Sequence, residues 1–221
     1  MRVSVIAIDG PAGAGKSTIA RAVADRLGFE YLDTGAMYRA LALAALESGT
    51  DLANAAALTA LTESVDIDLR GDVVKLDGRD VSELIRGPGV TAAVSKVAAV
   101  DGVRRAMAAM QRARADAGNL VMEGRDIGSA VVPTADVKIF LTASKEERAR
   151  RRARQMGLAT DEQSLKELSR SIEKRDRADA ERKASPFVKA NDAVVVDSTG
   201  KDVETIVDEI ASAALRVIDE H

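Results

Sequence analysis

Short runs of β-branched and aliphatic residues alternate along this chain with longer stretches rich in alanine, leucine, arginine and glutamate. Runs of this length are typical of buried strands, and their alternation with helical stretches favours an α/β fold with a parallel sheet. We expect core strands at Val3–Ile8, Glu30–Leu32, Leu120–Met122, Val137–Leu141 and Val194–Val196. We expect helices at Lys16–Leu27, Ala36–Ser48, Val103–Ala117, Ser144–Gln155, Glu162–Asp179 and Val203–Ile218. Ser144 followed by Glu147 is a capping box, which fixes the start of the fourth helix.

One segment departs from this alternation. Its apolar residues have a period of two, with turn signals at Gly71-Asp72 and Asp77-Gly78. The apolar positions are Val65, Ile67, Leu69, Val73, Val74, Leu76 and Val81. This pattern predicts a small antiparallel sheet, closed by the run Arg86-Gly87-Pro88-Gly89 before another helical stretch. We therefore interpret residues 63–97 as an insertion into the parallel core.

The most specific motif lies between the first strand and the first helix. The run is Gly10-Pro11-Ala12-Gly13-Ala14-Gly15-Lys16-Ser17, followed by Thr18, and it fits the phosphate-binding pattern G-x-x-x-x-G-K-[ST]. Glycines let the backbone curl around a phosphate with its N–H groups inward, and the helix N-terminus adds partial positive charge. Lys16 would reach the outer phosphates, and the hydroxyl of Ser17 would ligate magnesium. The motif predicts a nucleoside triphosphate site over residues 10–18.

Composition narrows the chemistry. A chain of 221 residues suits one domain with insertions, and a net charge of -3 argues against a general nucleic-acid binder. There is no cysteine, and the single histidine is His221, so thiolate sites and histidine catalysis are excluded. We see no signal peptide and no membrane-spanning run, which suits a cytoplasmic protein. The remaining chemistry uses carboxylates, arginines, lysine and backbone amides.

Arginines are unusually dense toward the C-terminus. They are Arg148, Arg150, Arg151, Arg152, Arg154, Arg170, Arg175, Arg177 and Arg182. A solvated charged face would explain them, but Arg148, Arg151, Arg152 and Gln155 share a helix face without acidic partners at i+4. Like charges so arranged repel unless an anion neutralises them. We therefore expect some of these arginines to meet the triphosphate during transfer.

Two classes of phosphate-loop protein compete at this point. The run Asp197-Ser198-Thr199-Gly200 fits the DxxG element of GTPase switches, but the chain has no [NT]-K-x-D guanine motif. A kinase acting on a phosphorylated acceptor explains more, because arginines bring two anions together and stabilise the charge of the transition state. A phosphate oxygen is already ionised near neutral pH, so no general base is needed. An arginine-bearing lid would exclude water.

Four separated motifs resemble those of bacterial cytidylate kinases. They are Asp33–Arg39, Ala93–Ala99 with Val103-Arg104, Glu123–Gly128 and Arg175–Arg182. The resemblance covers essentially the whole chain, insertion included. It implies a three-layer nucleoside monophosphate kinase fold, with a five-stranded parallel core, an antiparallel β/α insertion and a helical lid. The implied division is 1–62 core, 63–97 monophosphate-binding insertion, 98–147 core, 148–182 lid and 183–221 core.

The resemblance also implies a reaction and its residues. The γ-phosphate of ATP would pass to CMP or dCMP with magnesium, giving ADP and the diphosphate. The resemblance implies a monomer whose partners are these small molecules, with no nucleic acid and no membrane. Ser95, Arg104 and Asp126 resemble residues that recognise cytosine, since a carboxylate accepts from its exocyclic amine. The remaining assignments are Arg39, Arg125 and Arg182 to the acceptor phosphate, Arg175 and Asp179 to the sugar, Thr34 near the acceptor phosphate, and Lys16, Arg125, Arg148 and Arg152 to catalysis.

Several alternatives stay open. Asp126 could cap a helix or pair with Arg125, and Asp179 could be a surface carboxylate. Glu123 stands where the family usually has aspartate, so only Ser17 is assigned to the metal. The alternative functions are another small-molecule kinase with a UMP, GMP or shikimate acceptor, and a GTP-dependent switch. A nucleic-acid-binding ATPase is disfavoured by the scarcity of aromatic residues, with two Tyr, three Phe and no Trp.

Overall fold

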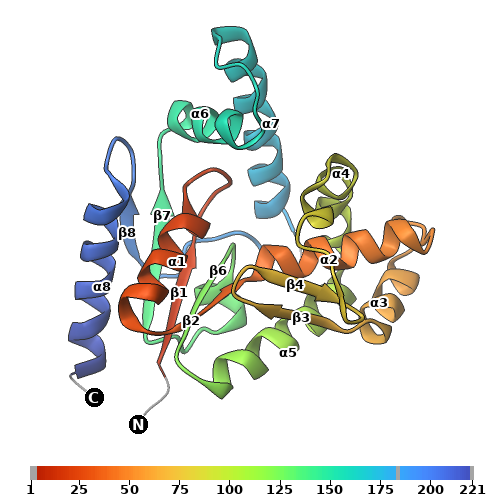
Figure 1. Ribbon diagram of the computed structural model, residues 1–221, viewed down its shortest axis with the longest axis horizontal. Coiled ribbons are helices and arrows are strands. Elements are labelled where there is room, and N and C mark those ends of the chain that lie inside the picture. Colours follow the sequence, from red (N-terminus) through yellow and green to blue (C-terminus); the bar gives the residue numbers. More distant parts are fainter. Residues whose placement is uncertain (1–3, 183–184, 220–221) are drawn as a thin grey trace. The chain divides into compact units, whose positions relative to one another are not determined.

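The computed structural model describes residues 4–182 and 185–219 (Figure 1). Val3, at which the first strand was expected to begin, and the lone histidine His221 lie outside the described residues. The chain forms two compact units. The first unit holds the chain up to Glu30 and from Gly118 onward, and the second holds Tyr31–Ala117.

A five-stranded parallel sheet forms the core, as predicted. In order across the sheet its strands are β2 (Glu30–Asp33), β6 (Leu120–Gly124), β1 (Val5–Asp9), β7 (Val137–Thr142) and β8 (Val194–Asp197). Strand β1 lies at the centre, with Val5 opposite Leu120 of β6 and Ile6 opposite Val137 of β7. Every residue of β1 is buried, as expected for a parallel strand covered on both faces. The central position of β1 places the end of this strand, and the loop after it, among the carboxyl ends of its neighbours.

Helices of the first unit follow the predicted ranges closely. They are α1 (Lys16–Leu27), α6 (Lys145–Gln155), α7 (Glu162–Ala180) and α8 (Val203–Asp219). Helix α1 packs against α8, and α6 packs against α7 (Figure 1). The Ser144 hydroxyl accepts a hydrogen bond from the Glu147 amide at 3.2 Å, which confirms the predicted start of α6. A short π-helix, η2 (Ile127–Val131), follows β6 and was not predicted.

The second unit contains the predicted antiparallel sheet. Its strands are β3 (Ile67–Arg70), β4 (Val73–Leu76) and β5 (Arg79–Asp80). The alternating residues Ile67, Leu69, Val74 and Leu76 are all buried, which is the period-two pattern that the sequence shows. The unit's helices are α2 (Thr34–Glu47), α3 (Ala55–Ser64), α4 (Pro88–Val97) and α5 (Asp101–Ala117), with a 3-10 turn η1 (Leu84–Arg86).

Two details of this unit differ from the prediction. Val65 ends α3 instead of opening a strand, and Val81 follows β5. Helix α3 itself was not predicted, because Leu58 and Thr62 are its only buried residues among those described and give almost no periodic signal. None of the helices within the described ranges combines the length and apolarity needed to cross a membrane.

Candidate active site

The phosphate-binding loop has the backbone that its glycines predict. Gly13 and Gly15 have φ angles of 76° and 93°, in the left-handed region that favours glycine. At Gly10 the constraint is a close approach, since a Cβ there would lie 2.0 Å from the carbonyl oxygen of Leu141 in β7. The loop therefore packs directly on the end of the neighbouring strand, where a side chain would displace one or the other.

The start of α1 is suited to an anion. Gly15 is its N-cap, no side chain caps the helix there, and its first turn contains no acidic residue. Ser17 and Thr18 in this turn are exposed. Uncapped N–H groups and the positive end of the helix dipole thus lie beside the loop, which is the arrangement that binds phosphate.

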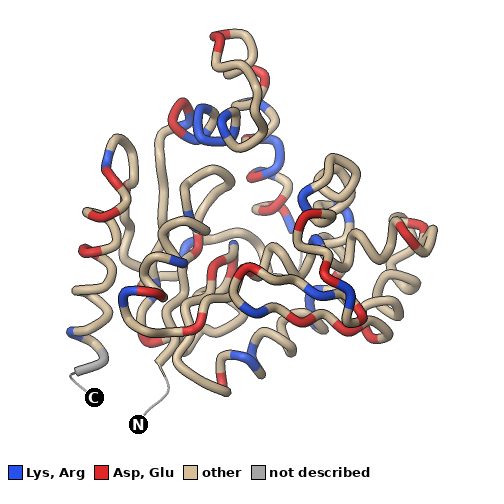
Figure 2. Tube along the Cα trace, viewed as in Figure 1, with Lys and Arg blue, Asp and Glu red and all other residues tan. Residues whose placement is uncertain are grey.

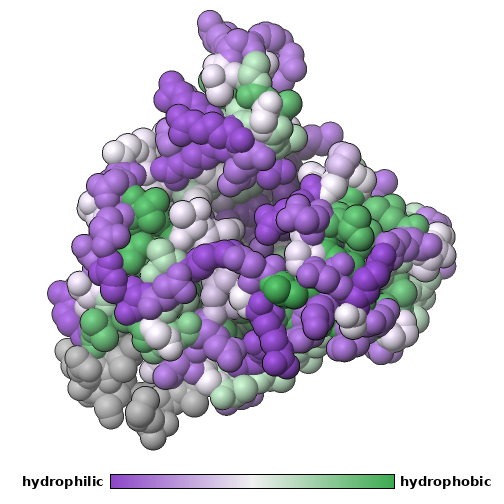
Figure 3. Space-filling model, viewed as in Figure 1, coloured by the Kyte–Doolittle hydropathy of each residue, from purple (hydrophilic) through white to green (hydrophobic). Residues whose placement is uncertain are grey.

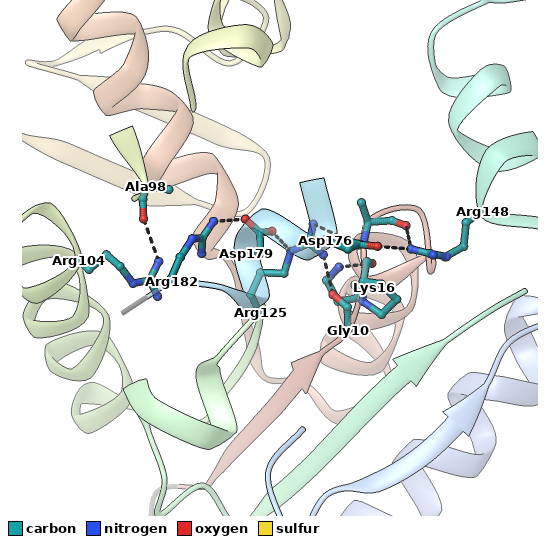
Figure 4. Close-up of polar contacts among 11 residues, drawn as sticks. Gly10, Lys16, Ala98, Arg104, Arg125, Arg148, Asp176, Asp179 and Arg182 are labelled. Carbon is teal, nitrogen blue, oxygen red and sulfur yellow. Dashed lines mark hydrogen bonds and ion pairs between the residues drawn. The ribbon is translucent and has the colours of Figure 1, made fainter. Parts of the chain in front are cut away.

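Lys16 is held over the loop. Its Nζ donates to the Pro11 carbonyl at 3.0 Å (Figure 4). Burial, and next the positive charge of Arg125, lower the pKa of Lys16 to about 7, while the charges of Glu123 and Asp9 oppose the shift. A triphosphate beside this amine would favour its protonated form.

Asp176 of α7 joins the loop to two arginines. One carboxylate oxygen accepts from the Ala12 amide at 3.0 Å and lies 3.7 Å from Nη2 of Arg125. The other oxygen pairs with Nη1 of Arg148, which also donates to the Ala12 carbonyl at 3.2 Å (Figure 4). Arg148 is therefore buried against the phosphate loop. From the sequence we expected this arginine to belong to a lid that closes over the substrates. Asp176 was not singled out from the sequence, although it lies inside the Arg175–Arg182 motif.

Arg151 is the second arginine of α6 that reaches the loop. Its Nη1 donates to the Ala14 carbonyl at 3.0 Å and to the Ser198 hydroxyl at 2.9 Å. The Ser198 hydroxyl also bonds to the Ala14 carbonyl at 3.0 Å, so the DxxG-like run braces the phosphate loop. Arg152 instead contacts Gln155 at 3.4 Å.

No acidic residue lies at i+4 on this arginine face, but two of its arginines have acidic partners at other positions. Nε of Arg151 donates to Glu147 at 2.9 Å, one helical turn earlier, and Arg148 is paired with Asp176. Glu147 lies four residues before Arg151, and Asp176 belongs to α7, so the residues at i+4 reveal neither partner. The charge of α6 is nevertheless mostly basic along its length (Figure 2), and its surface is strongly hydrophilic (Figure 3).

A second arginine cluster is built on Asp179. Nε of Arg125 donates to Asp179 at 3.0 Å, and Arg182 pairs with the other oxygen of this carboxylate (Figure 4). Nη1 of Arg125 also donates to the Gly10 carbonyl at 2.6 Å, and its guanidinium lies 5.5 Å from the ring centroid of Phe187. Asp179 is buried, not a surface carboxylate. It orients two guanidinium groups that were assigned to the acceptor phosphate.

Two further assigned residues, Asp126 and Arg175, belong to the first unit, together with the unassigned Glu123. Asp126 is buried at the N-cap of η2, but its side chain makes no capping hydrogen bond. Glu123 is buried at the end of β6, and Arg175 lies on α7 one residue before Asp176. The capping alternative for Asp126 therefore loses its support.

The second unit holds the other assigned residues. Asp33 caps α2 by accepting from the Ala36 amide at 2.9 Å, and Nη2 of Arg39 lies 3.7 Å from its second oxygen. Thr34 is buried in the first turn of the same helix. Thr34 and Arg39 are thus brought to the same end of α2.

Arg104 and Ser95 lie on α5 and α4 of this unit. Arg104 is buried, donates to the Ala98 carbonyl at 3.3 Å, and lies 5.7 Å from the ring centroid of Tyr38 (Figure 4). Ser95 is half-buried on α4. A buried guanidinium held by a carbonyl and a ring is oriented before any ligand arrives.

A central parallel strand that leads into a glycine loop, a half-buried lysine and an uncapped helix define a phosphate-loop nucleotide-binding protein. Residues 6–216 match the family model described as Cytidylate kinase. The chain is 49% identical over 214 residues to the cytidylate kinase of Symbiobacterium thermophilum, covering 95% of each chain, and 50% identical over 212 residues to that of Geobacillus kaustophilus, covering 93% of each. The chain belongs to the cytidylate kinase family. An uncharacterized protein from Eubacterium ventriosum shares the fold, with a TM-score of 0.55, 13% identity and full coverage of both chains.

Proposed function

We propose that this protein transfers the γ-phosphate of ATP to CMP or dCMP, giving ADP and CDP or dCDP. The observation that carries the proposal is its identity of about 50% to relatives named cytidylate kinase, over nearly the full length of both chains. The phosphate loop supplies the complementary physical argument, because it is built to hold a triphosphate.

On the donor side, the amides of residues 10–18 would hold the phosphates of ATP and Lys16 would reach the outer ones. The contacts of Arg148 with Ala12 support a role for this arginine at the phosphates. Arg152 was assigned a similar role by resemblance, but the contacts of Arg151 with Ala14 favour Arg151 as the second lid arginine. Transfer would then be catalysed by positioning and by positive charge.

The donor atoms present fit magnesium that arrives with the nucleotide. The described residues contain no group of three His, Cys, Asp or Glu side chains that could hold a metal alone. Magnesium is commonly held by phosphates, water and one or two protein oxygens, and the exposed Ser17 hydroxyl at the start of α1 is suited to be one of them. When bound, the ion would neutralise charge on the phosphates.

On the acceptor side, Arg39, Arg125 and Arg182 would bind the phosphate of CMP, with Thr34 nearby. A guanidinium held by a carboxylate, as Arg125 is by Asp179, presents its remaining N–H groups in a fixed direction. Arg175 and Asp179 would contact the sugar.

Cytosine would be recognised by Asp126, with Ser95 and Arg104. A carboxylate accepts from the exocyclic amine of cytosine and repels the carbonyl that uracil has in its place. Asp126 is buried and directly follows Arg125, which is assigned to the acceptor phosphate.

The division into core (1–62, 98–147 and 183–221), monophosphate-binding insertion (63–97) and lid (148–182) remains part of the proposal. A monomeric state and a cytoplasmic location are likewise predictions that rest on the family resemblance.

Label transfer tests the proposed reaction. The protein is incubated with magnesium, CMP and ATP that is radiolabelled in its γ-phosphate, and the products are separated. We expect the label in CDP, and none there with a Lys16→Ala variant whose thermal unfolding matches the native protein. Label released as inorganic phosphate, at a rate independent of CMP, would favour an ATPase and contradict the proposal.

A further inference from the structure

A buried carboxylate that none of these roles uses lies at the end of β1. Asp9 is 5% exposed and accepts two backbone hydrogen bonds, from the Ile127 amide at 2.9 Å and from the Gly128 amide at 2.8 Å. Burying a carboxylate costs free energy unless it is paired or hydrogen-bonded. The two amide contacts satisfy the buried carboxylate of Asp9. The amides directly follow Arg125 and Asp126, which are assigned to the acceptor.

The two amides begin the π-helix η2. The first N–H groups of a helical turn have no acceptor within the helix, and the N-cap side chain usually supplies one. Here the N-cap residue is Asp126, whose side chain makes no such bond. Asp9, from a different strand, caps the turn in its place.

A contact in the opposite direction completes the connection. Arg125 donates from Nη1 to the carbonyl of Gly10 at 2.6 Å. The dipeptide Asp9-Gly10 and the segment Arg125–Gly128 are therefore joined by three hydrogen bonds. Arg125 and Asp126 lie directly before the capped amides, so their backbone is fixed relative to the phosphate loop.

We propose that Asp9 is a positioning residue: by capping η2 it holds the backbone of Asp126 in place for recognition of cytosine and that of Arg125 in place for the acceptor phosphate. This inference rests on the proposed function. It predicts that a change at Asp9 alters acceptor recognition although Asp9 touches no substrate.

Asp9→Asn tests the inference. Asparagine keeps one acceptor oxygen but turns an NH₂ group toward a backbone N–H, so one capping bond is lost. We expect kcat/KM for CMP to fall by about 100-fold, as small misplacements of substrate-binding groups produce. The ratio of kcat/KM for CMP to kcat/KM for UMP should fall about tenfold. The Kd for ADP should stay close to the native value, since Asp9 does not hold the amides of the phosphate loop.

Asp136→Asn is the matched control. Asp136 accepts from the Val5 amide at 2.8 Å, which is the same kind of contact at the opposite end of β1. We expect this variant to keep the native ratio of CMP to UMP use, even if its unfolding temperature falls. The same narrowing in both variants, or an unchanged ratio in Asp9→Asn, would overturn the inference.

Hydrogen exchange separates this inference from the proposed reaction. The amides of Ile127 and Gly128 should exchange faster in Asp9→Asn and at the native rate in Asp136→Asn. Native exchange in both variants overturns the capping role, whether or not the protein uses CMP. If Asp9→Asn does not fold, Asp9→Glu takes its place, because the extra methylene moves both acceptor oxygens away from their positions in the native protein. The amides of Ile127 and Gly128 should then exchange faster and the preference for CMP should fall. Faster exchange with a native ratio of CMP to UMP use would overturn the inference.

Discussion

Carboxylates of the first unit make two kinds of contact: some accept from backbone amides, and others pair with arginines. Asp9 accepts only from backbone amides in the contacts described above, whereas Asp176 and Asp179 orient arginines. Asp126 does not cap the turn at which it lies. If Asp126 binds the cytosine base, its substitution should have an effect that depends on the base. If the arginines bind phosphates, their substitution should affect all acceptors alike.

Replacing Asp126 with alanine should impair use of CMP far more than use of UMP. A hydrogen bond to a charged group contributes about 1.5–3 kcal/mol, so kcat/KM for CMP should fall by roughly 10- to 100-fold. Steady-state kinetics with both acceptors measures this, and circular dichroism checks that the variant is folded. An equal loss with CMP and UMP would rule out the role in base recognition.

Replacing Arg39 with alanine should weaken all nucleoside monophosphates alike. Phosphate contacts carry no information about the base, so the ratio of CMP to UMP use should stay native while both KM values rise about tenfold or more. The same kinetic assay applies. A base-dependent effect would mean that Arg39 contacts something other than phosphate.

At the scale of elements, the sequence predicts helices and strands that have a repeating pattern or a local cap. It misses elements that are short or that are capped by residues distant in the sequence. Alternation predicted β3 and β4, and the Ser144 cap predicted the start of α6, because both signals are local. The π-helix η2 has five residues and is capped from another strand, so no local pattern reveals it.

The candidate site follows the same rule. The phosphate loop and its lysine could be assigned from spacing alone. Family motifs pointed to Arg125, Asp126 and Asp179, but not to Asp176, whose partners Ala12 and Arg148 are distant in the sequence. The contact of Arg151 with Ala14 likewise depends on packing.

The phosphate loop makes its own prediction as an element. Gly10→Ala should abolish nucleotide binding, because the new Cβ would lie 2.0 Å from the Leu141 carbonyl and push the loop away from β7. Gly118→Ala is the control, since a Cβ at that position meets no atom within 4 Å. Isothermal titration with ADP measures the effect. Native affinity in Gly10→Ala would show that the loop tolerates a displacement of this size.

For the molecule as a whole, the dependence of the unfolding free energy on pH should reflect the buried carboxyl group of Asp9. Burial raises the pKa of Asp9 from 3.8 to about 6. The folded state therefore holds this proton over a range in which the unfolded chain has released it, and the contribution of Asp9 to stability falls as pH rises from about 4 to about 6. Above that range the cost of the buried charge is fully present.

Chemical denaturation at several pH values tests this signature. The unfolding free energy of the native protein minus that of Asp9→Asn should fall by up to about 3 kcal/mol from pH 4 to pH 7, since each pKa unit corresponds to about 1.4 kcal/mol. The hydrogen bond lost in the variant adds an offset that does not depend on pH. A difference that stays constant, or that rises with pH, would show that the pKa of Asp9 is not raised in the folded protein.

The two units divide the assigned residues: the first contains the phosphate loop, Arg125 and Asp126, and the second contains Arg39 and Arg104. We predict that substitutions of assigned residues in either unit change the use of the same acceptor, and that this acceptor contains cytosine. This claim concerns the whole chain, and no single substitution tests it as directly as substrate choice.

The most direct test is ADP release from ATP and magnesium, with CMP, dCMP, UMP, AMP and GMP offered separately as acceptors. We predict fast turnover confined largely to CMP and dCMP. Preference for another monophosphate would keep the kinase but contradict the assignment of Ser95, Arg104 and Asp126 to cytosine. Turnover that depends on none of the acceptors would contradict the proposed transfer of phosphate to CMP or dCMP.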